Sequence, residues 1–442
     1  MIPRPPRRAR QRSSASRGAR CTVAWPGCAA RRVALSAVLV AAACSREQRT
    51  DPALTEPSPA TTAGWSTPRE IVGLQAVLVS QENRVSDLAV DQAGRLHAVF
   101  IDSTDRGRGH RVVYARSDGT WGAFAVLDST PGHSDLATIV TDRRGHATVL
   151  WFKARDPRAR GPQVTDLVSR TLDGSTWRPT ESVFRHDQPI TGYGVAFIDR
   201  PDGVTAGVAT IDGSEWRSLE RSGDRWDVGA PIAGNGHQFA WASQNRGEEQ
   251  RALAYIGTFW TPAHPANTSD VGLRVLRGRV FDLPNVVHRD LVHFSYHPRL
   301  ALDSRGTYHV LWHETGPVGG MLPRRILYAT SADGRQWSPA RDVTPDLTRG
   351  EGVYSPRLHI DARDRLHYTF TYFASGGASN PVPVYMRLEN GAWLPAERVF
   401  PEFAAIDSEL ETAMDAQGRL WAVFGDGRGR YYSSVLDTRA IR

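Results

Sequence analysis

Cysteine is scarce in this chain of 442 residues, and its three copies lie close to the N-terminus, at positions 21, 28 and 44. Residues 45–442 therefore contain no disulfide, no cysteine-ligated metal site and no thiol nucleophile. Long hydrophobic runs are also missing, because the one apolar stretch, Val33–Ala43, is too short to span a bilayer comfortably. This absence excludes a polytopic membrane protein.

Acidic residues are absent from the first 43 positions, which carry nine arginines. The formal net charge of +7 comes from this segment, because the other 45 basic residues face 47 acidic ones. The rest of the chain is thus close to neutral. That balance removes the electrostatic argument for a nucleic-acid partner.

The N-terminal segment has the parts of an export signal, with Arg31 and Arg32 preceding the apolar stretch. Ala41-Ala42-Ala43-Cys44 resembles a bacterial lipobox, which implies a signal segment at 1–43 and a lipidated Cys44. An ordinary signal peptide is the alternative. Ser45 by the same resemblance implies a lipid anchor in the outer membrane. Residues 44–63, rich in Pro, Thr and Ala, are typical of a flexible tether.

Internal repeats predict the fold of residues 64–442. A hairpin signature close to D-x-x-G recurs between two apolar stretches, as in AVDQAGRLHAVF and ALDSRGTYHVLW. Such a turn needs a residue with positive φ. Its anchors are Asp91, Asp142, Asp199, Asn245, Asp303, Asp361 and Asp415.

A second signature, a strand ending in a turn and an aromatic residue, follows each hairpin and also recurs seven times. Its aromatic positions are Trp65, Trp121, Trp177, Trp226, Phe281, Trp337 and Trp393. Each repeat supplies four strands, so we predict an all-β protein, a seven-bladed β-propeller with four-stranded antiparallel blades. The last repeat lacks its outer strand, and WSTPREIV at 65–72 matches that strand. The N-terminal strand is therefore expected to close the last blade.

The turn SADGRQW at 331–337 resembles the Asp-box of sialidase-like propellers, and TLDGSTW at 171–177 is a weaker copy. Residues 65–437 are thus similar to bacterial lipoproteins with BNR repeats. The resemblance implies the architecture, in which the Asp-box aspartate accepts backbone N–H groups. It does not imply sialidase activity, because a third arginine and a Tyr–Glu pair cannot be assigned beside Arg299 and Arg357.

Propeller geometry predicts that the residues at the start of each innermost strand converge at one mouth of the central channel. Histidine, tyrosine and arginine are concentrated there. The catalytic candidates are His133, Tyr193, His237, His297, Arg299, Tyr354 and Arg357. The ligand-binding candidates, from strand starts and from loops after the second strands, are Arg84, Asp135, Trp260, His313, Glu314 and Tyr372.

Three chemistries fit these residues. A polysaccharide lyase uses His or Tyr as acid and base beside an arginine that neutralises a carboxylate. A metal site from His133, His237 and His297 is the second, although no spacing motif supports it. Binding of a glycan without chemistry is the third.

The main prediction is a non-catalytic, monomeric propeller that binds extracellular carbohydrate or a protein partner. A lyase, ahead of a sialidase-like hydrolase, is the alternative. No cofactor is predicted, with zinc and calcium left open.

Overall fold

A computed structural model describes residues 64–441 of the chain, apart from short gaps. The gaps are at 75–77, 79–82, 105–108, 130–133, 155–163, 188–189, 198–203, 211–214, 234–236, 247, 258–268, 278–279, 291, 316–322, 349–351, 374–380, 404–405, 407–409 and 427. The predicted signal segment and tether, including Cys44, lie outside the described residues. None of the helical segments in the described part has the length and apolar character needed to cross a bilayer.

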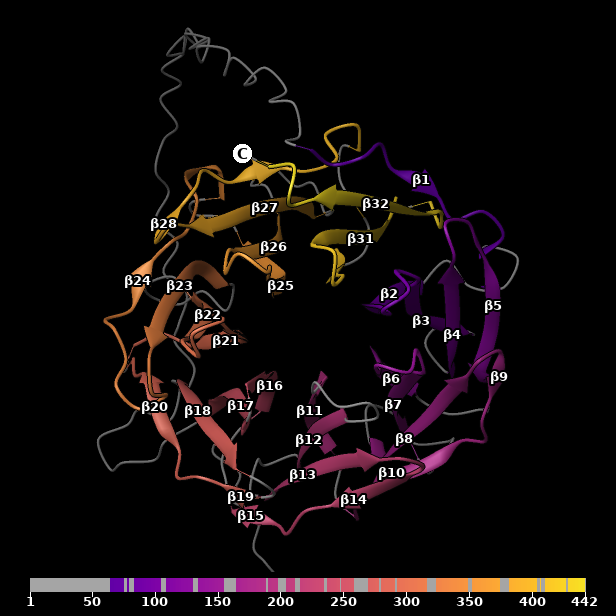
Figure 1. The fold of residues 1–442 in the computed structure, drawn as a ribbon, viewed down its shortest axis with the longest axis horizontal. Coiled ribbons are helices and arrows are strands. Elements are labelled where there is room, and N and C mark those ends of the chain that lie inside the picture. The colour runs from indigo at the N-terminus through magenta and orange to yellow at the C-terminus, as the bar shows by residue number, and fades with distance from the viewer. Residues whose placement is uncertain are drawn as a thin grey trace, which may run out of the picture. The chain divides into compact units, whose positions relative to one another are not determined.

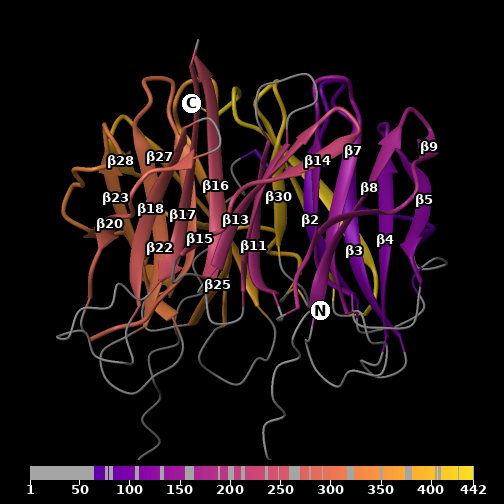
Figure 2. The ribbon, with the colours of Figure 1, turned by 90° about the horizontal axis from the view of Figure 1, so that it is seen from below.

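Seven antiparallel sheets form a ring around a central channel (Figure 1). The strands run between the two faces of the ring (Figure 2). The predicted seven-bladed β-propeller is thus confirmed.

The first three blades follow one another along the chain, and in each of them the first strand is the innermost one and the last lies at the rim. Blade 1 contains β2 (Asn83–Val90), β3 (Leu96–Thr104), β4 (Gly109–Ser117) and β5 (Trp121–Asp128). Blade 2 contains β6 (Ser134–Thr141), β7 (Ala147–Ala154), β8 (Val164–Asp173), β9 (Thr176–Trp177) and β10 (Glu181–Arg185). Blade 3 contains β11 (Ile190–Phe197), β12 (Val204–Thr210), β13 (Glu215–Ser222), β14 (Arg225–Val228) and β15 (Ile232–Ala233).

The next three blades repeat this order. Blade 4 contains β16 (His237–Arg246), β17 (Glu248–Gly257), β18 (Asp270–Arg277), β19 (Val280–Phe281) and β20 (Asn285–His288). Blade 5 contains β21 (Ser295–Leu302), β22 (Tyr308–Thr315), β23 (Pro323–Ser331) and β24 (Arg341–Asp342), followed by a 3-10 helix at Asp346–Thr348. Blade 6 contains β25 (Gly352–Ile360), β26 (Leu366–Phe373), β27 (Val382–Glu389), β28 (Ala392–Trp393) and β29 (Glu397–Arg398).

Blade 7 joins the two ends of the propeller. It contains β30 (Glu411–Met414), β31 (Arg419–Gly425), β32 (Tyr431–Asp437) and, on its outer edge, β1 (Arg69–Glu70). Arg69 is opposite Ser433, Glu70 is opposite Tyr432, and Trp65 forms a further bridge with Leu436. The predicted closure by the N-terminal strand is confirmed.

The hydrophobic core lies between neighbouring blades, because each sheet is apolar on both of its faces. One cluster packs Leu273 and Val287 of blade 4 against Leu300 and Trp312 of blade 5. Large aromatic side chains fill the space that widens toward the rim. For example, Tyr114 of blade 1 meets Trp177 of blade 2 edge to face, with ring centroids 4.8 Å apart.

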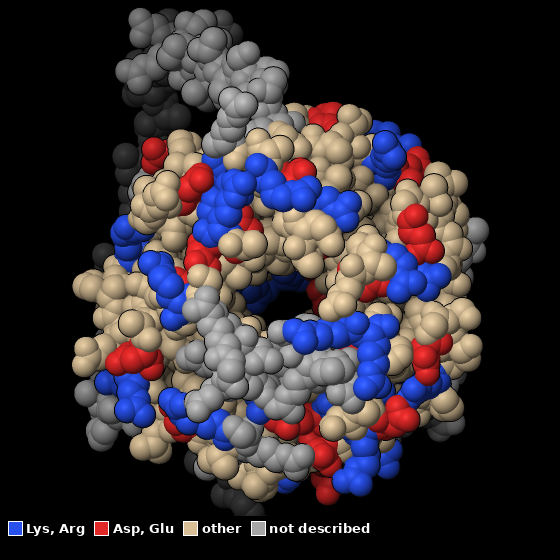
Figure 3. Space-filling model, in the orientation of Figure 1, with Lys and Arg blue, Asp and Glu red and all other residues tan. Residues whose placement is uncertain are grey.

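The hairpin turns anchored by Asp91, Asp142, Asp303, Asp361 and Asp415 lie together on one side of the ring, which we call the turn face. The predicted anchor Asp199 lies outside the described residues, and Asn245 belongs to strand β16 and not to a turn. In blade 1 the Asp91 carboxylate accepts a hydrogen bond from the Arg95 backbone N–H at 2.9 Å and pairs with the Arg95 side chain. The glycines of four such turns adopt the expected positive φ, at 77° for Gly94, and Asp364 takes the same conformation in blade 6. Figure 3 shows a central opening with Lys and Arg side chains around it.

A buried Asp–His–Tyr chain supports the turns of two blades. In blade 1, His97 Nδ1 lies 2.8 Å from the Tyr114 hydroxyl, and His97 Nε2 lies 3.3 Å from the Asp91 carboxylate. Burial lowers the pKa of His97, so the ring is neutral at neutral pH. Blade 6 repeats the arrangement with Asp361, His367 and Tyr385. Blade 5 has the same three residue types, but His309 Nε2 lies 3.6 Å from the Asp303 carboxylate, so only the contact with Tyr328 is a hydrogen bond.

Candidate functional site

The central channel contains a cavity on the side where the innermost strands begin, which we call the start face. This cavity, of about 440 Å³, is lined by Arg84, His297, Arg299 and Arg357 together with Phe239, Trp241 and residues between them. Four of the predicted site residues therefore line one cavity. A second cavity of about 630 Å³ lies toward the turn face and shares wall residues such as Asp87 and Arg357 with the first.

A β-bulge shapes the start of the innermost strands. The pairing register shifts there in β6, β16, β21 and β25. The bulged residues have positive φ without being glycine, between 47° and 54° at Leu136, Gln238, His297 and Ser355. Bulges re-aim side chains next to functional sites. The same backbone conformation recurs in four blades, and in blade 5 it falls on His297, which lines the cavity.

Arg299 and Arg357 connect neighbouring blades. Arg299 Nε donates to the Pro356 carbonyl of blade 6 at 2.6 Å. Arg357 Nε donates to Glu411 of blade 7 at 2.6 Å, and its Nη2 pairs with the other oxygen of the same buried carboxylate. Each guanidinium also donates to the carbonyl of the proline before it, at 2.9 Å. These bonds give both arginines a structural role, in which each connects its own blade to the next one.

One histidine and two tyrosines at the start of the innermost strands and in the channel wall are held in their neutral forms. Burial lowers the pKa of His359, whose Nε2 lies 2.9 Å from the Thr412 hydroxyl, to about 3. Burial also raises the pKa of Tyr354 and that of Tyr296. A tyrosine whose pKa is raised is a poor general base.

Asp87 is a channel residue that the sequence analysis missed. Its carboxylate accepts hydrogen bonds from the backbone N–H groups of Leu88 and Ile139, both at 2.9 Å, and from the Thr138 hydroxyl. Burial raises the pKa of this carboxyl. The only feature of the sequence that could have pointed to Asp87 is its position in the first strand of a repeat, which faces the channel.

Several candidates lie elsewhere than predicted. His313, Glu314 and Tyr372 were expected in loops above the mouth, but they belong to the second strands β22 and β26. The alternating apolar pattern of these strands simply continues further than the turn signals indicate. His313 is fully buried, with its Nε2 2.8 Å from the Tyr368 hydroxyl.

Other candidates are only partly placed. Tyr193, His237 and Asp135 have their backbones in β11, β16 and β6, while their side chains are outside the described part. His133 and Trp260 fall in gaps between the described ranges. The predicted metal triad of His133, His237 and His297 therefore stays a prediction.

No protein family and no curated protein sequence matches this chain. Among solved structures, a protein of unknown function from Dyadobacter fermentans is 12% identical with a TM-score of 0.49, covering 83% of this chain and 97% of its own. An α-L-arabinanase of Penicillium chrysogenum complexed with arabinobiose is 12% identical with a TM-score of 0.48, covering 86% and 99%. A PL25 ulvan lyase is 13% identical with a TM-score of 0.49, covering 79% and 93%. Similarities this distant do not transfer an activity.

Proposed function

We propose that this chain is a non-catalytic binding protein that holds an extracellular carbohydrate at the start-face mouth of its channel. The observation that carries the proposal is the composition of the cavity. Arg84, His297 and Arg299 line it together with Phe239 and Trp241, whose buried rings pack into the core behind the wall. Carbohydrates present many hydroxyl groups, so a concave site with several hydrogen-bonding side chains suits them.

The chemistry of the mouth supports binding over turnover. Arg299 and Arg357 donate to carbonyl groups and to Glu411 of neighbouring blades. A lyase would need such an arginine to neutralise a substrate carboxylate. His359 is neutral, since burial lowers its pKa to about 3, and the raised pKa of Tyr354 keeps its hydroxyl protonated.

One observation favours the lyase alternative. His297 lines the cavity two residues before Arg299, and its backbone has a φ of 50°. Strained backbone conformations in non-glycine residues are frequent at active sites. His297 is thus the residue around which a catalytic function would be built.

Titration calorimetry of the full-length protein against acidic and neutral polysaccharides tests the proposal. We expect one of these glycans to bind, and His297→Ala and Arg84→Ala to weaken the binding about tenfold or more, because each removes a hydrogen-bonding group from the cavity. Arg143→Ala on the turn face is the matched control, since Arg143 is exposed. Binding that Arg143→Ala weakens and the two start-face variants leave unchanged would place the ligand elsewhere.

We further propose that Cys44 carries a lipid that tethers the propeller to the outer membrane, on the strength of the lipobox-like Ala41–Cys44 segment. Labelling of the expressed chain with radioactive palmitate is expected to be lost in Cys44→Ser and kept in Cys28→Ser. Equal labelling of both variants would contradict the anchor.

A further inference from the structure

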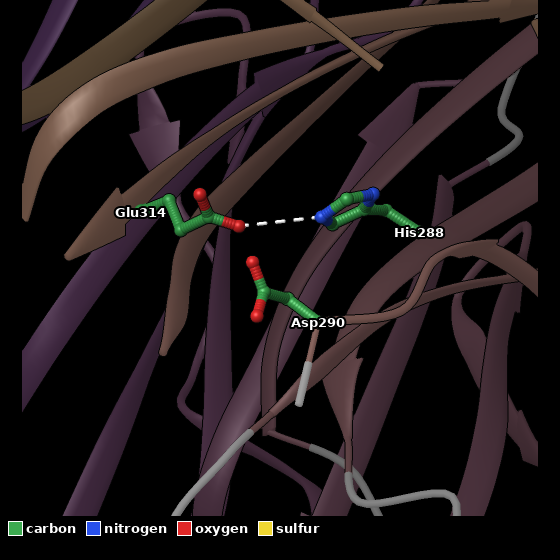
Figure 4. Close-up of side chains that lie close together, drawn as sticks. All are labelled: His288, Asp290 and Glu314. Atoms are coloured by element: carbon green, nitrogen blue, oxygen red, sulfur yellow. Dashed lines mark ion pairs between the residues drawn. The ribbon is translucent and has the colours of Figure 1, made fainter. Parts of the chain in front are cut away.

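Three potential metal ligands meet at the junction between blades 4 and 5. His288 is the last residue of β20, Asp290 follows it by two positions, and Glu314 lies near the end of β22 (Figure 4). One ligand atom from each side chain lies within 4.8 Å of those of the other two. His288 Nε2 and Glu314 Oε1 are 3.3 Å apart. Residues from two blades thus converge on one point.

Glu314 is fully buried, and one of its oxygens has no hydrogen-bond partner among the described residues. Its Oε2 pairs with Arg325, whereas Oε1 faces His288 without a hydrogen bond. His288 Nε2 is likewise a buried atom without a hydrogen-bond partner in the described part of the chain. An unsatisfied buried carboxylate oxygen is costly, so both atoms indicate that a further group belongs between them.

The spacing of His288 and Glu314 fits two ligands of a tetrahedral metal ion, and Asp290 lies close enough to supply the third. Zinc binds histidine nitrogen and carboxylate oxygen at about 2.0–2.2 Å, which places neighbouring tetrahedral ligands about 3.3 Å apart. This spacing equals the 3.3 Å between His288 Nε2 and Glu314 Oε1. His293 orients the Asp290 carboxylate, because its Nδ1 lies 2.7 Å from Asp290 Oδ2. Carboxylates bound by metals are usually oriented in this way.

We propose that His288, Asp290 and Glu314 bind one divalent transition-metal ion, zinc by preference. Three protein ligands leave a fourth position for water. The His288 side chain is 20% exposed and that of Asp290 16%, so an ion can reach the site from solvent. Because the ligands come from two blades, the ion links β20 to β22 and stabilises the ring at this junction. This site is independent of the carbohydrate site.

The chain offers a matched control that has a similar composition but cannot chelate. His146 lies between two carboxylates, with Nδ1 2.9 Å from Asp142 and Nε2 3.3 Å from Asp173. The two carboxylates face opposite nitrogens of the ring. A single ion therefore cannot contact all three groups, and His146→Ala should leave metal binding unchanged.

The test is titration of Zn²⁺ into the full-length protein after chelator treatment and desalting, for the wild type and for His288→Ala, Glu314→Gln and His146→Ala. We expect the wild type and His146→Ala to bind one ion at the proposed site with equal affinity. The Zn²⁺ affinity of His288→Ala and of Glu314→Gln should fall by more than the roughly 10–100-fold that follows when only a hydrogen-bond partner of a metal ligand is removed. Co²⁺ in place of Zn²⁺ should give ligand-field bands without thiolate charge transfer, which separates this site from Cys21, Cys28 and Cys44.

Thermal unfolding followed by circular dichroism gives a second readout. Zn²⁺ should raise the Tm of the wild type and of His146→Ala but not that of His288→Ala. If Glu314→Gln fails to fold, Asp290→Asn takes its place. Failure of the folded wild type to bind Zn²⁺, or equal affinities in all the variants, would overturn the proposal and leave only the contact between His288 and Glu314.

Discussion

At the scale of single residues, the buried histidines on the second strands have a structural role. His97 lies between the Asp91 carboxylate and the Tyr114 hydroxyl, in an order that resembles a catalytic relay. The same order recurs in blades 5 and 6, on the turn face and away from the start-face cavity. A catalytic constellation has no reason to be repeated in this way. We therefore interpret these chains as supports that join the turn of a blade to its third strand.

Tyr114→Phe should lower the free energy of unfolding by about 1–2 kcal/mol, because it leaves a buried histidine nitrogen without its partner. Urea denaturation measures this change. Tyr296→Phe is the control, since its half-buried hydroxyl makes no hydrogen bond to the described residues, and we expect a change below about 0.5 kcal/mol. Equal effects of the two substitutions would argue against a role for the His97 contact.

Acid should destabilise the propeller in two stages. Burial lowers the pKa of His97, His309 and His367, so the unfolded chain takes up protons on these side chains first as the pH falls below about 6.5. Hydrogen bonds from the turns, outweighing burial, lower the pKa of Asp91 and Asp303 to about 2. Their contribution, on the order of 1 kcal/mol each after screening, is present above about pH 4 and lost between pH 4 and 2.

The measurement is the urea midpoint at a series of pH values from 7 to 2.5. It should fall throughout this range, and Asp303→Asn should flatten the fall below pH 4. A midpoint that stays constant or rises on acidification would contradict the assigned protonation states.

At the scale of elements, the two-residue strand β1 and the residues around it close the ring of blades. Ser66 N–H donates to the Val435 carbonyl and Ile71 N–H to the Tyr431 carbonyl, both at 2.8 Å. Trp65 packs against Tyr385 of blade 6 and against Phe400, with ring centroids 6.1 and 5.3 Å apart. The N-terminal segment thus joins blade 7 and seals its contact with blade 6.

Trp65→Ala should therefore destabilise the protein by about 3–5 kcal/mol, because it opens a cavity at the point of ring closure. Val72→Ala, only seven positions along, is the control because Val72 is 73% exposed. Thermal unfolding of the two variants measures the loss of Tm that each substitution causes. If Trp65→Ala lowered the Tm no more than Val72→Ala does, closure of the ring by the N-terminal segment would not contribute to the stability of the propeller.

At the scale of the whole molecule, the architecture could be predicted from sequence because each repeat carries its own signals. Asp91 and its equivalents mark the turns, and Trp65 with the residues after it marks the missing outer strand. These features are local, and the number of times they recur along the chain gives the number of blades. Contacts between blades are different, since Arg357 and Glu411 are 54 positions apart and no pattern links them. The sequence therefore identified Arg357 but not the carboxylate that holds it.

The site was predictable only in outline for the same reason. The topology brings Arg84, His297, Arg299 and Arg357 to one cavity, as predicted from the strand starts. Glu314 was expected near that mouth, but it is buried beside His288. This position results from the contact between two blades, and the periodicity of the sequence does not reveal contacts between blades. The bulge that turns His297 into the channel is likewise a property of the folded strand.

Whether the start-face cavity binds a carbohydrate without altering it, as we propose, is decided by looking for products. The full-length protein would be incubated with the glycan that it binds best, while the absorbance of unsaturated uronates and the number of reducing ends are followed. We expect saturable binding with neither signal above that of a His297→Ala control. Unsaturated products that are formed by the wild type and abolished by His297→Ala would contradict it and establish a lyase.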